Sequence, residues 1–511
     1  MRKIFQLLIR PIDNFLNAIT MYRLVLYYLV GLILVALVLG VLGVLAVSPL
    51  HLLFSTVLIL VLCLAVNEIF SRVWKAPKNV ESAYITALIL ALIISPPASF
   101  TDTTFLMFVF WAAVWSMASK YILAIRKKHI FNPAAFAVAL TALTISQVAT
   151  WWVGTLFMVP FVFIGGVLLV RKLRRGDAVI SFIIVATIGT LLSHNLTPTN
   201  MLVTASGLFI YSPLFFFVFV MFTEPLTMPP SRLLRILYGV VVGVLFMPAL
   251  HFGSFYLTPE LALLGGNIFS YFVSPKQKVV LKLKQKIQVT KDVYDFIFEP
   301  SEQLRFTPGQ YLEWTLPHEK PDSRGNRRYF TIASTPDDTV VYLGIKTYPN
   351  GSSFKNALLA LKEGDILSAG SLAGDFILPK DPKQKLVFMA GGIGITPYLS
   401  MIQHLINKND QRDIVLFYAN KTESDIAYLD FLEDAKKKIP LTVVHALSDE
   451  QNPKYVGKIT APLVVEKVPD LADRVFYLSG PHGMVNAFND MLRNQGIPKN
   501  HIKKDFFPGF A

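Results

Sequence analysis

The fold of the C-terminal half is decided by residues 385–397, which read KLVFMAGGIGITP. An apolar run typical of a buried parallel strand leads into a glycine cluster and then a helix. Glycines at such a turn let backbone N–H groups approach a pyrophosphate, and the helix N-terminus that follows favours an anion. An ordinary tight turn uses the same residues, so the surroundings have to decide. The residues expected to form this cradle are Gly391, Gly392, Gly394, Ile395, Thr396 and Pro397.

The pattern of a strand followed by a helix continues along the chain. Further apolar runs at 413–418, 441–447 and 474–479 predict a parallel α/β sheet within residues 383–511. Upstream, the runs at 280–289 and 293–298 predict antiparallel strands, as a small β-barrel within residues 277–382 needs.

Four further motifs stand in a characteristic order. They are PGQY at 308–311, RYFTIAS at 328–334, GSS at 351–353 and SGPHGM at 479–484. Together with the glycine cluster they resemble the ferredoxin–NADP reductase family over about residues 278–511. The resemblance implies that FAD and NAD(P)H bind here. It also implies that Arg328 pairs with the flavin pyrophosphate, Phe330 stacks on the isoalloxazine and Thr331 hydrogen-bonds near its N5.

The same resemblance assigns the other site residues. Thr331, Ser479 and Phe510 are the expected catalytic residues; Ser479 replaces the family's cysteine at the hydride path, and Phe510 fits plain packing equally well. The stretch YANKTESD at 418–425 offers one lysine beside two acids, which favours NADH slightly and leaves NADPH open. The remaining cofactor-binding residues are Tyr311, Tyr329, Ser334, Lys346, Gly351, Ser352, Ser353, Asn420, Gly480, Pro481 and Met484.

The N-terminal half, residues 1–276, has a membrane-protein composition. The whole chain is 53% hydrophobic and only 16% charged. Lys and Arg fall in alternate loops, such as those that begin at Arg72 and Arg171, so the positive-inside rule places both termini and the C-terminal half in the cytoplasm. About ten membrane spans are expected, near 23–47, 50–70, 82–98, 104–124, 132–149, 151–170, 178–195, 206–223, 233–250 and 259–274.

Composition also excludes several functions. The net charge of +14 resides partly in short loops between apolar runs, so nucleic-acid binding is not expected. Cys63 is the single cysteine, which rules out an internal iron–sulfur cluster or a cysteine-based metal site, and no metal site is expected. The candidate haem ligands of the bundle lie at predicted span ends without pairing, so no haem is expected; they are His51, His129, His194 and His251.

Three stretches of the N-terminal half resemble a second family. They are Glu81 to Ile89, Lys120 with HIFNPA at 129–134, and Thr223-Glu224-Pro225. They resemble the B subunit of sodium-translocating NADH:quinone reductase and the D subunit of the Rnf complex over about residues 80–270. The resemblance implies about ten helices and a flavin in the membrane. Its candidate site residues here are Lys120, Asn132, Thr223 and Glu224.

One departure from that family affects the cofactor. The Ser-Gly-Ala-Thr motif that carries covalent FMN does not occur in the chain. Covalent FMN is therefore not expected, and the bundle is expected to hold non-covalent FMN, riboflavin or a quinone.

The sequence thus predicts a membrane flavoenzyme. Electrons pass from NAD(P)H through FAD to a flavin or quinone in the bundle, and from there to a quinone or an acceptor across the membrane. One alternative couples electron transfer to sodium or proton movement through Glu68, Glu81 or Glu224. Another is a redox-inactive bundle that tethers a reductase for a soluble partner. Membrane lipid and an electron acceptor are the expected partners, and the oligomeric state stays open.

Overall fold

The computed structural model describes the chain in stretches separated by short gaps. The described residues are 11–13, 15–16, 19–74, 80–125, 128–193, 198–253, 255–274, 279–319, 321–322, 325–349, 351–450 and 453–505. The chain divides into two compact units, the first ending at Gln277 and the second beginning at Lys278. Phe510 and His194 lie outside the described residues.

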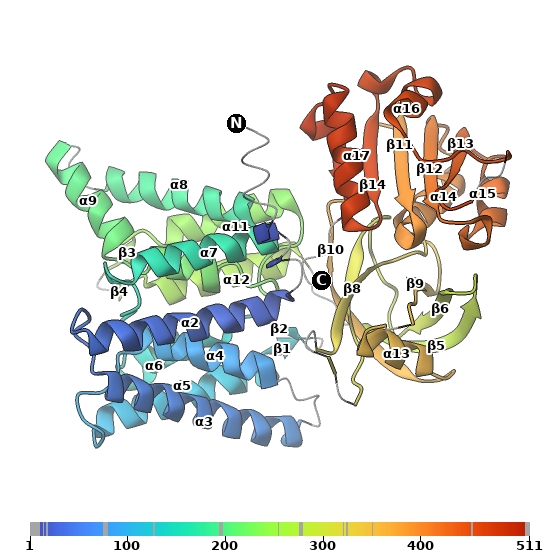
Figure 1. Ribbon diagram of the computed structural model, residues 1–511. Coiled ribbons are helices and arrows are strands. Elements are labelled where there is room, and N and C mark those ends of the chain that lie inside the picture. The colour runs from blue at the N-terminus through green and yellow to red at the C-terminus, as the bar shows by residue number, and fades with distance from the viewer. Residues whose placement is uncertain are drawn as a thin grey trace. The chain divides into compact units, whose positions relative to one another are not determined.

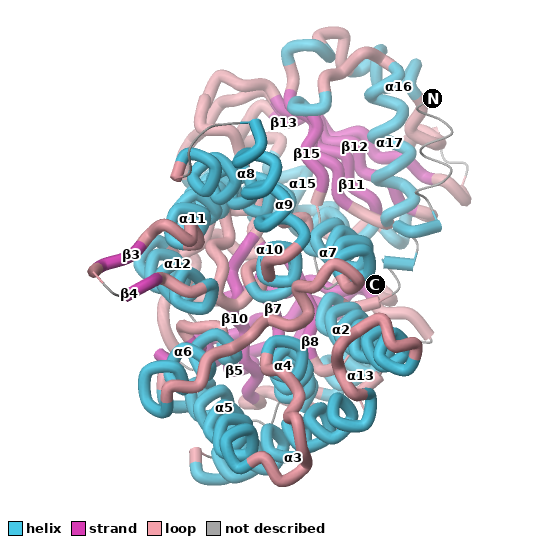
Figure 2. Tube along the Cα trace, turned by 90° about the vertical axis from the view of Figure 1, so that its left-hand side faces the viewer, coloured by secondary structure: helices cyan, strands magenta, loops and turns pink. Residues whose placement is uncertain are grey.

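The first unit is a bundle of apolar helices that run roughly alongside one another in Figure 1 and are seen nearly end-on in Figure 2. Two short hairpins, β1 (Ala124–Ile125) with β2 (Lys128–His129) and β3 (His251–Phe252) with β4 (Phe255–Tyr256), precede α6 and α12. The helices are α2 (Met21–Val41), α3 (Pro49–Val73), α4 (Val80–Ile93), α5 (Thr103–Ile122), α6 (Pro133–Ile145), α7 (Val159–Leu173), α8 (Gly176–Leu192), α9 (Pro198–Ile210), α10 (Leu214–Phe216), the π-helical turn η1 (Phe217–Met221), α11 (Arg232–Leu245) and α12 (Pro259–Val273).

The bundle consists of two groups of helices that pack in the same way. In the first group α3 packs on α5, α5 on α6 and α2 on α4; in the second α8 packs on α11, α11 on α12 and α7 on α10. Each group has a β-hairpin before its last helix. The groups meet where α2 contacts α7 and where α6 contacts α12.

The expectation of about ten membrane spans is wrong, because most helices of the bundle are too short to cross a membrane. In the described residues, α2, α3 and α5 are long and apolar enough to cross a membrane, and a bent pair, Asn200–Ile210 with Leu214–Met221, raises the number to at most four. At 1.5 Å per residue a helix of about 14 residues reaches about 21 Å, short of the ~30 Å hydrocarbon core. The apolar runs in the sequence are longer than the helices that they form. In α4, for example, Pro96 and Pro97 prevent the helix from continuing past its end at Ile93.

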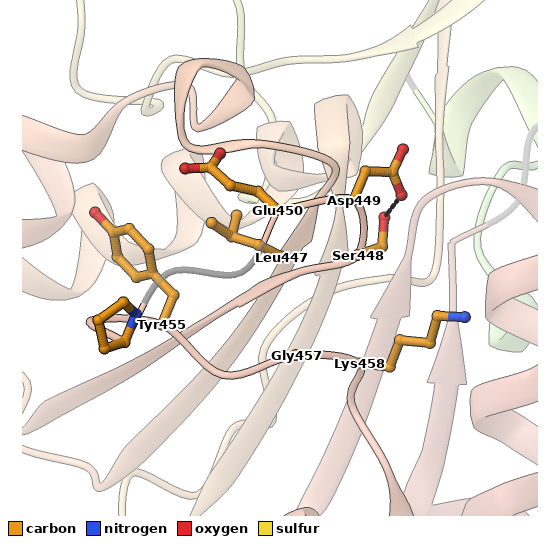
Figure 3. A pocket seen from close by; sticks show the side chains of 8 residues that line it. Leu447, Ser448, Asp449, Glu450, Tyr455, Gly457 and Lys458 are labelled. Carbon is orange, nitrogen blue, oxygen red and sulfur yellow. Dashed lines mark hydrogen bonds between the residues drawn. The ribbon is translucent and has the colours of Figure 1, made fainter.

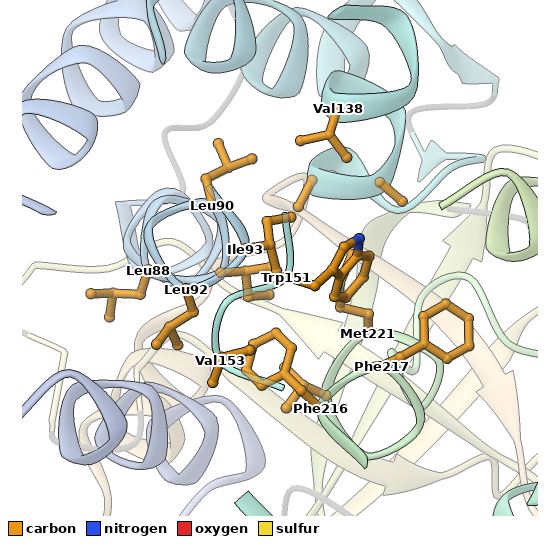
Figure 4. Packing of buried hydrophobic residues seen from close by; sticks show 14 of the residues in the cluster. Leu88, Leu90, Leu92, Ile93, Val138, Trp151, Val153, Phe216, Phe217 and Met221 are labelled. Carbon is orange, nitrogen blue, oxygen red and sulfur yellow. The ribbon is translucent and has the colours of Figure 1, made fainter. Parts of the chain in front are cut away.

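The core of the bundle is dense around Trp151. Figure 4 shows its ring beside the α4 side chains and near Phe217 and Met221. The backbone N–H of Trp151 donates to Ile93 O at 2.9 Å, and its indole N–H donates to Glu260 Oε2 at 3.3 Å. These bonds allow a loop after α6 to enter the apolar core, because they satisfy its polar groups.

The second unit begins with a six-stranded antiparallel sheet, as the sequence predicted. Its order is β8-β7-β10-β5-β6-β9. Just beyond β8, Ala333 N donates to Tyr342 O of β9 at 3.0 Å, so the two edges approach and the sheet is a near-closed barrel around Phe296, Phe298 and Trp314. The strands are β5 (Val279–Gln288), β6 (Val293–Pro300), β7 (Tyr311–Thr315), β8 (Arg327–Thr331), β9 (Val341–Lys346) and β10 (Ile366–Ala373), and the helix α13 (Ser353–Ala360) follows β9.

A five-stranded parallel sheet follows, and it confirms the predicted α/β architecture. Its order is β13-β12-β11-β14-β15. The strand β15 was not predicted, because it spans three residues and two of them are Lys503 and Lys504. The elements are β11 (Leu386–Gly391), α14 (Thr396–Asn407), β12 (Ile414–Asn420), α15 (Leu429–Ala435), β13 (Leu441–Leu447), α16 (Ala461–Lys467), β14 (Val475–Ser479), α17 (His482–Asn494) and β15 (Ile502–Lys504).

Candidate functional site

The glycine cluster forms a tight turn from β11 into α14. A single 3₁₀ turn, Gly392–Ile395, joins them, and Gly392 has a positive φ of 51°. A Cβ on Gly394 would lie 2.6 Å from Gly480 Cα and N, and a Cβ on Gly391 would lie 2.2 Å from Met484 Cε. The turns after β11 and β14 therefore pack backbone to backbone, which only glycine allows.

Adjacent strands bring the residues that are predicted to hold the nicotinamide to the same edge of the sheet. Ser479 ends β14, is buried, and donates a hydrogen bond from Oγ to Asp505 Oδ2 at 3.0 Å. Pro481 precedes α17, and Met484 lies in its first turn. Because parallel strands end together, the two turns lie at the carboxyl edge of the sheet, where α/β sheets bind ligands.

A pocket opens at the carboxyl end of β13 (Figure 3). Its volume of about 730 Å³ is within the range of small-molecule sites. Backbone bonds tie it to the end of β12, since Ser448 N donates to Asn420 O and Asp449 N donates to Lys421 O, both at 3.0 Å. It is lined by Leu447, Ser448, Asp449, Glu450, Pro453, Tyr455, Gly457 and Lys458.

The barrel places the predicted flavin residues on β7 and β8. Tyr311 pairs with Thr331 across the two strands, and the rings of Tyr311 and Tyr329 meet edge to face at 5.5 Å. Phe330 is on the other face of β8, where its ring lies 5.9 Å from that of Phe354 in α13. Strand alternation therefore puts Phe330 on the same face as the arginine two residues before it.

Arg328 lies at the N-terminus of α13, as an arginine that binds phosphate should. Its Nη2 donates to Asp322 Oδ1 at 2.8 Å, and Ser353 N at the first residue of α13 donates to Asp322 Oδ2 at 3.2 Å. Ser352 caps this helix by accepting from Lys355 N at 3.3 Å. A guanidinium and a helix N-terminus thus form one anion cradle, which fits a diphosphate. The motifs did not single out Asp322, because no spacing marks it.

Two predicted cofactor residues lie where the barrel meets the parallel sheet. Lys346 pairs with Asp292 at 3.0 Å and with Asp425, beyond β12, at 3.4 Å. Burial acts to lower the pKa of Lys346, but the hydrogen bonds and charges of the two aspartates outweigh it and raise that pKa. Ser334 O accepts from Ser400 Oγ of α14 at 2.6 Å. Lys346 and Ser334 therefore tie the two sheets together in addition to any contact with a cofactor.

In the first unit, the structure brings Asn132 and Glu224 together. Asn132 caps α6 through Oδ1, and its Nδ2 donates to Glu224 Oε2 at 2.9 Å. His129 Nε2 lies 3.4 Å from Glu224 Oε1. Asn132 N donates to Asn267 Oδ1 at 2.8 Å, and Asn267 Nδ2 donates to Tyr238 Oη at 3.2 Å. We call these five residues the Glu224 cluster. No local sequence pattern predicted the link from Asn132 through Asn267 to Tyr238.

The other two membrane-domain candidates have separate partners. Lys120 Nζ donates to Ser82 O at 3.0 Å and to Thr86 Oγ1 at 2.9 Å, and Thr223 Oγ1 donates to Phe219 O at 2.7 Å. Among the described residues no group of three or more His, Cys, Asp or Glu is placed to hold a metal ion.

Two family models match the second unit. The oxidoreductase FAD-binding domain matches residues 280–376, and the oxidoreductase NAD-binding domain matches residues 388–490. Neither match extends into the first unit, so its resemblance to the sodium-translocating reductase and Rnf subunits stays a prediction.

Similar proteins cover the same part of the chain. The reductase component of propane 2-monooxygenase from Rhodococcus jostii is 29% identical over 46% of this chain and 64% of its own length. Flavohemoprotein A from Dictyostelium discoideum is 24% identical over 44% and 58%. Among solved structures, the FAD/NAD-binding domain of nitric oxide dioxygenase from Vibrio cholerae is 19% identical, covers 45% of this chain and 98% of that chain, and has a TM-score of 0.41.

The chain spans about three fifths of the length of the first curated relatives it matches. Both domain matches fall on the sheets that carry the two predicted cradles. The C-terminal half of this chain therefore carries an FAD-binding and an NAD-binding domain of oxidoreductases, which supports an NAD(P)H oxidoreductase that uses FAD.

Proposed function

We propose that this protein is a membrane-bound NAD(P)H dehydrogenase that passes electrons from FAD to a flavin or quinone held in its helical bundle. The proposal uses domain limits of 1–276 for the bundle, 277–382 for the FAD domain and 383–511 for the nucleotide domain. The observation that carries it is the covalent joining of a reductase module to an apolar bundle that contains the Glu224 cluster. Ionisable groups within such bundles are often functional, and the Glu224 side chain is only 21% exposed.

The reductase half supplies the electrons. Bound FAD accepts a hydride as two electrons and can release them one at a time. Arg328 and the N-terminus of α13 hold its diphosphate, and the turns after β11 and β14 hold the nicotinamide nucleotide. The hydrogen bond from Ser479 to Asp505 fixes the Ser479 side chain beside the expected hydride path.

The nucleotide is NADH in this proposal. The pocket beyond β12 and β13 is bordered by the carboxylates of Asp449 and Glu450, and Lys458 is the cation among its eight lining residues. A 2′-phosphate would approach these carboxylates, and like charges repel. NADPH is the alternative, with Lys421 as its phosphate partner.

The bundle lies in the cytoplasmic membrane, with the reductase half on the cytoplasmic side. Large apolar side chains face outward on the two longest helices, α2 and α3, and lipid is their partner in this proposal. They include Leu34, Val38, Leu53, Val57 and Val61. The basic residues in alternate loops support this orientation, because such loops tend to stay in the cytoplasm.

Flavin counting and quinone reduction test the proposal. The purified full-length protein in detergent should yield FAD plus about one FMN or riboflavin, or else should reduce added quinone with NADH. Glu224→Gln should lower quinone reduction at least tenfold and leave NADH:ferricyanide activity unchanged. Asp13→Asn removes a partly exposed carboxylate paired with Arg171 and should change neither. A protein with FAD alone and no quinone reduction would contradict the proposal.

A second candidate function is a tethered reductase that serves a soluble partner. Several relatives are named as reductase components or subunits, among them the reductase subunit of an aromatic O-demethylase from Amycolatopsis, 27% identical over 46% of this chain. Under this alternative the single cysteine requires that any iron–sulfur acceptor belongs to the partner. FAD as the sole flavin, with fast reduction of soluble one-electron acceptors, would favour it.

A third candidate couples the electron transfer to sodium or proton movement through Glu224. The contacts of its carboxylate favour a fixed charge instead, since Asn132 Nδ2 and Thr227 Oγ1 both donate to Oε2. Quinone reduction that rises with added sodium, or that acidifies the medium of sealed vesicles, would support coupling.

A further inference from the structure

Asp322 contacts both groups that are assigned to the FAD diphosphate. Its two carboxylate oxygens accept from Arg328 Nη2 at 2.8 and 3.1 Å, and Oδ2 also accepts from Ser353 N at 3.2 Å. The guanidinium also donates from Nη1 to Gly325 O at 3.0 Å and to Arg327 O. The Asp322 carboxylate therefore accepts hydrogen bonds from the same donors, the Arg328 guanidinium and the N-terminus of α13, that would suit phosphate oxygens.

Ser353 and His318 hold Asp322 at the N-terminus of α13. Asp322 N donates to Ser353 Oγ at 2.8 Å. His318 Nδ1 lies 2.8 Å from Leu316 O, so Nδ1 carries the proton, and in the neutral ring Nε2 accepts from Ser353 Oγ at 3.0 Å. The Ser353 hydroxyl is thus engaged as donor and as acceptor, and it positions the carboxylate on the helix N-terminus.

We propose that Asp322 is an internal competitor for the FAD diphosphate, so that FAD binds only as this carboxylate gives up Arg328 and Ser353 N. The inference rests on FAD binding by the second unit. A carboxylate and a diphosphate cannot share one guanidinium and one helix N-terminus without strong repulsion between like charges. FAD carries the larger negative charge and displaces Asp322. Without FAD, Asp322 keeps the cradle paired and stabilises the barrel.

The opposite role makes the opposite prediction. If Asp322 stayed in place and only oriented Arg328, its removal would leave the guanidinium misplaced and would weaken FAD binding. The sign of the change in FAD affinity therefore separates a competitor from a positioning residue.

The test is a binding titration on full-length protein in detergent after its flavin has been removed. Asp322→Asn should lower the Kd for FAD about tenfold, followed by flavin fluorescence anisotropy, and should lower the thermal midpoint of the flavin-free protein. ADP, which carries the diphosphate without the isoalloxazine, should gain by the same factor. Glu319→Gln makes the same charge change at an exposed residue nearby and should alter neither quantity.

Each outcome decides the matter. An unchanged or raised Kd in Asp322→Asn overturns the inference, and a raised one assigns a positioning role. Asp322→Ser provides the same readout where the asparagine variant fails to fold. If the wild-type protein does not bind FAD, the proposed function fails as well; if it binds FAD and Asp322→Asn does not differ, only this inference fails.

Discussion

At the scale of single residues, the proposed nucleotide site depends on glycines, which have no Cβ. Gly391, Gly394 and Gly480 let the turns after β11 and β14 approach more closely than any side chain permits. Each turn carries residues of the proposed nucleotide site, so under the proposal their separation sets the width of the cradle. The sequence showed the glycines, but their contact across two strands came only from the structure.

Gly394→Ala should therefore widen the cradle. Its Cβ would lie 2.6 Å from the backbone of Gly480, and overpacking of this kind costs about 1–3 kcal/mol. We expect the KM for NADH to rise about tenfold or more while FAD content stays the same, measured by steady-state kinetics. Gly483→Ala places its methyl where no atom lies within 4 Å and should leave the KM unchanged. Equal values for the two variants would show that the turns do not set the site.

Ser479→Ala should slow flavin reduction. The variant removes the hydroxyl that donates to Asp505, and it leaves a partly buried acceptor without that bond, at a cost of about 1–3 kcal/mol. We expect the rate of flavin reduction by NADH to fall about tenfold in stopped-flow measurements, with little change in KM. Ser479→Cys should retain more of the rate than the alanine variant. A rate equal to that of the wild type in Ser479→Ala would remove this residue from the hydride path.

At the scale of elements, ion pairs fix where neighbouring strands begin. Asp470 accepts from Lys385, just before β11, and from Arg474, just before β14, both at 2.7 Å. Arg474 also pairs with Asp413 before β12. These charges align the starts of three parallel strands and hence the turns at their far ends. In the bundle, local residues decide where the helices end: Pro and cap residues end several helices before the apolar run does.

The Asp470 pair predicts a pH dependence of stability. The hydrogen bond from Arg474, with that from Lys385, holds the pKa of Asp470 at about 2, below its ordinary value of 3.8. Because the folded-state pKa is depressed, its contribution is present above about pH 4 and is lost as the pH falls toward 2. Asp470→Asn should lower the thermal midpoint of the full chain at pH 7, and the difference should shrink below pH 4. A difference that is constant across this range would contradict the assignment.

At the scale of the whole molecule, the two units differ in where their large apolar side chains lie. The first unit exposes many of them on its helices. Val57 and Val61 of α3 are 50% and 57% exposed, while the second unit follows the usual pattern of a buried core. Surfaces of this kind on long helices indicate lipid contact. Among the described residues, α2, α3 and α5 are long and apolar enough to cross a membrane, which supports membrane association. The multi-pass topology is part of the proposal.

Charges on this face should prevent membrane insertion. Val57→Asp combined with Val61→Asp introduces two charges at the membrane centre, at a cost of about 3 kcal/mol each. We expect the variant to be lost from the alkali-resistant membrane pellet that retains the wild-type protein. Ile287→Asp, at a residue of the second unit that is 38% exposed, should stay in the pellet. Retention of the double variant would place α3 outside lipid.

The sequence by itself determined the fold of the second unit, and it predicted most residues of the candidate site. Period-two and strand-then-helix patterns are local consequences of burial, and glycines and motif arginines mark where the backbone meets an anion. It did not determine helix length in the bundle, because hydropathy continues through loops that prolines and caps exclude from helices. Only the tertiary structure decided that Asp322 contacts Arg328 and that Asn267 links Asn132 to Tyr238, since no local pattern records which distant side chains meet.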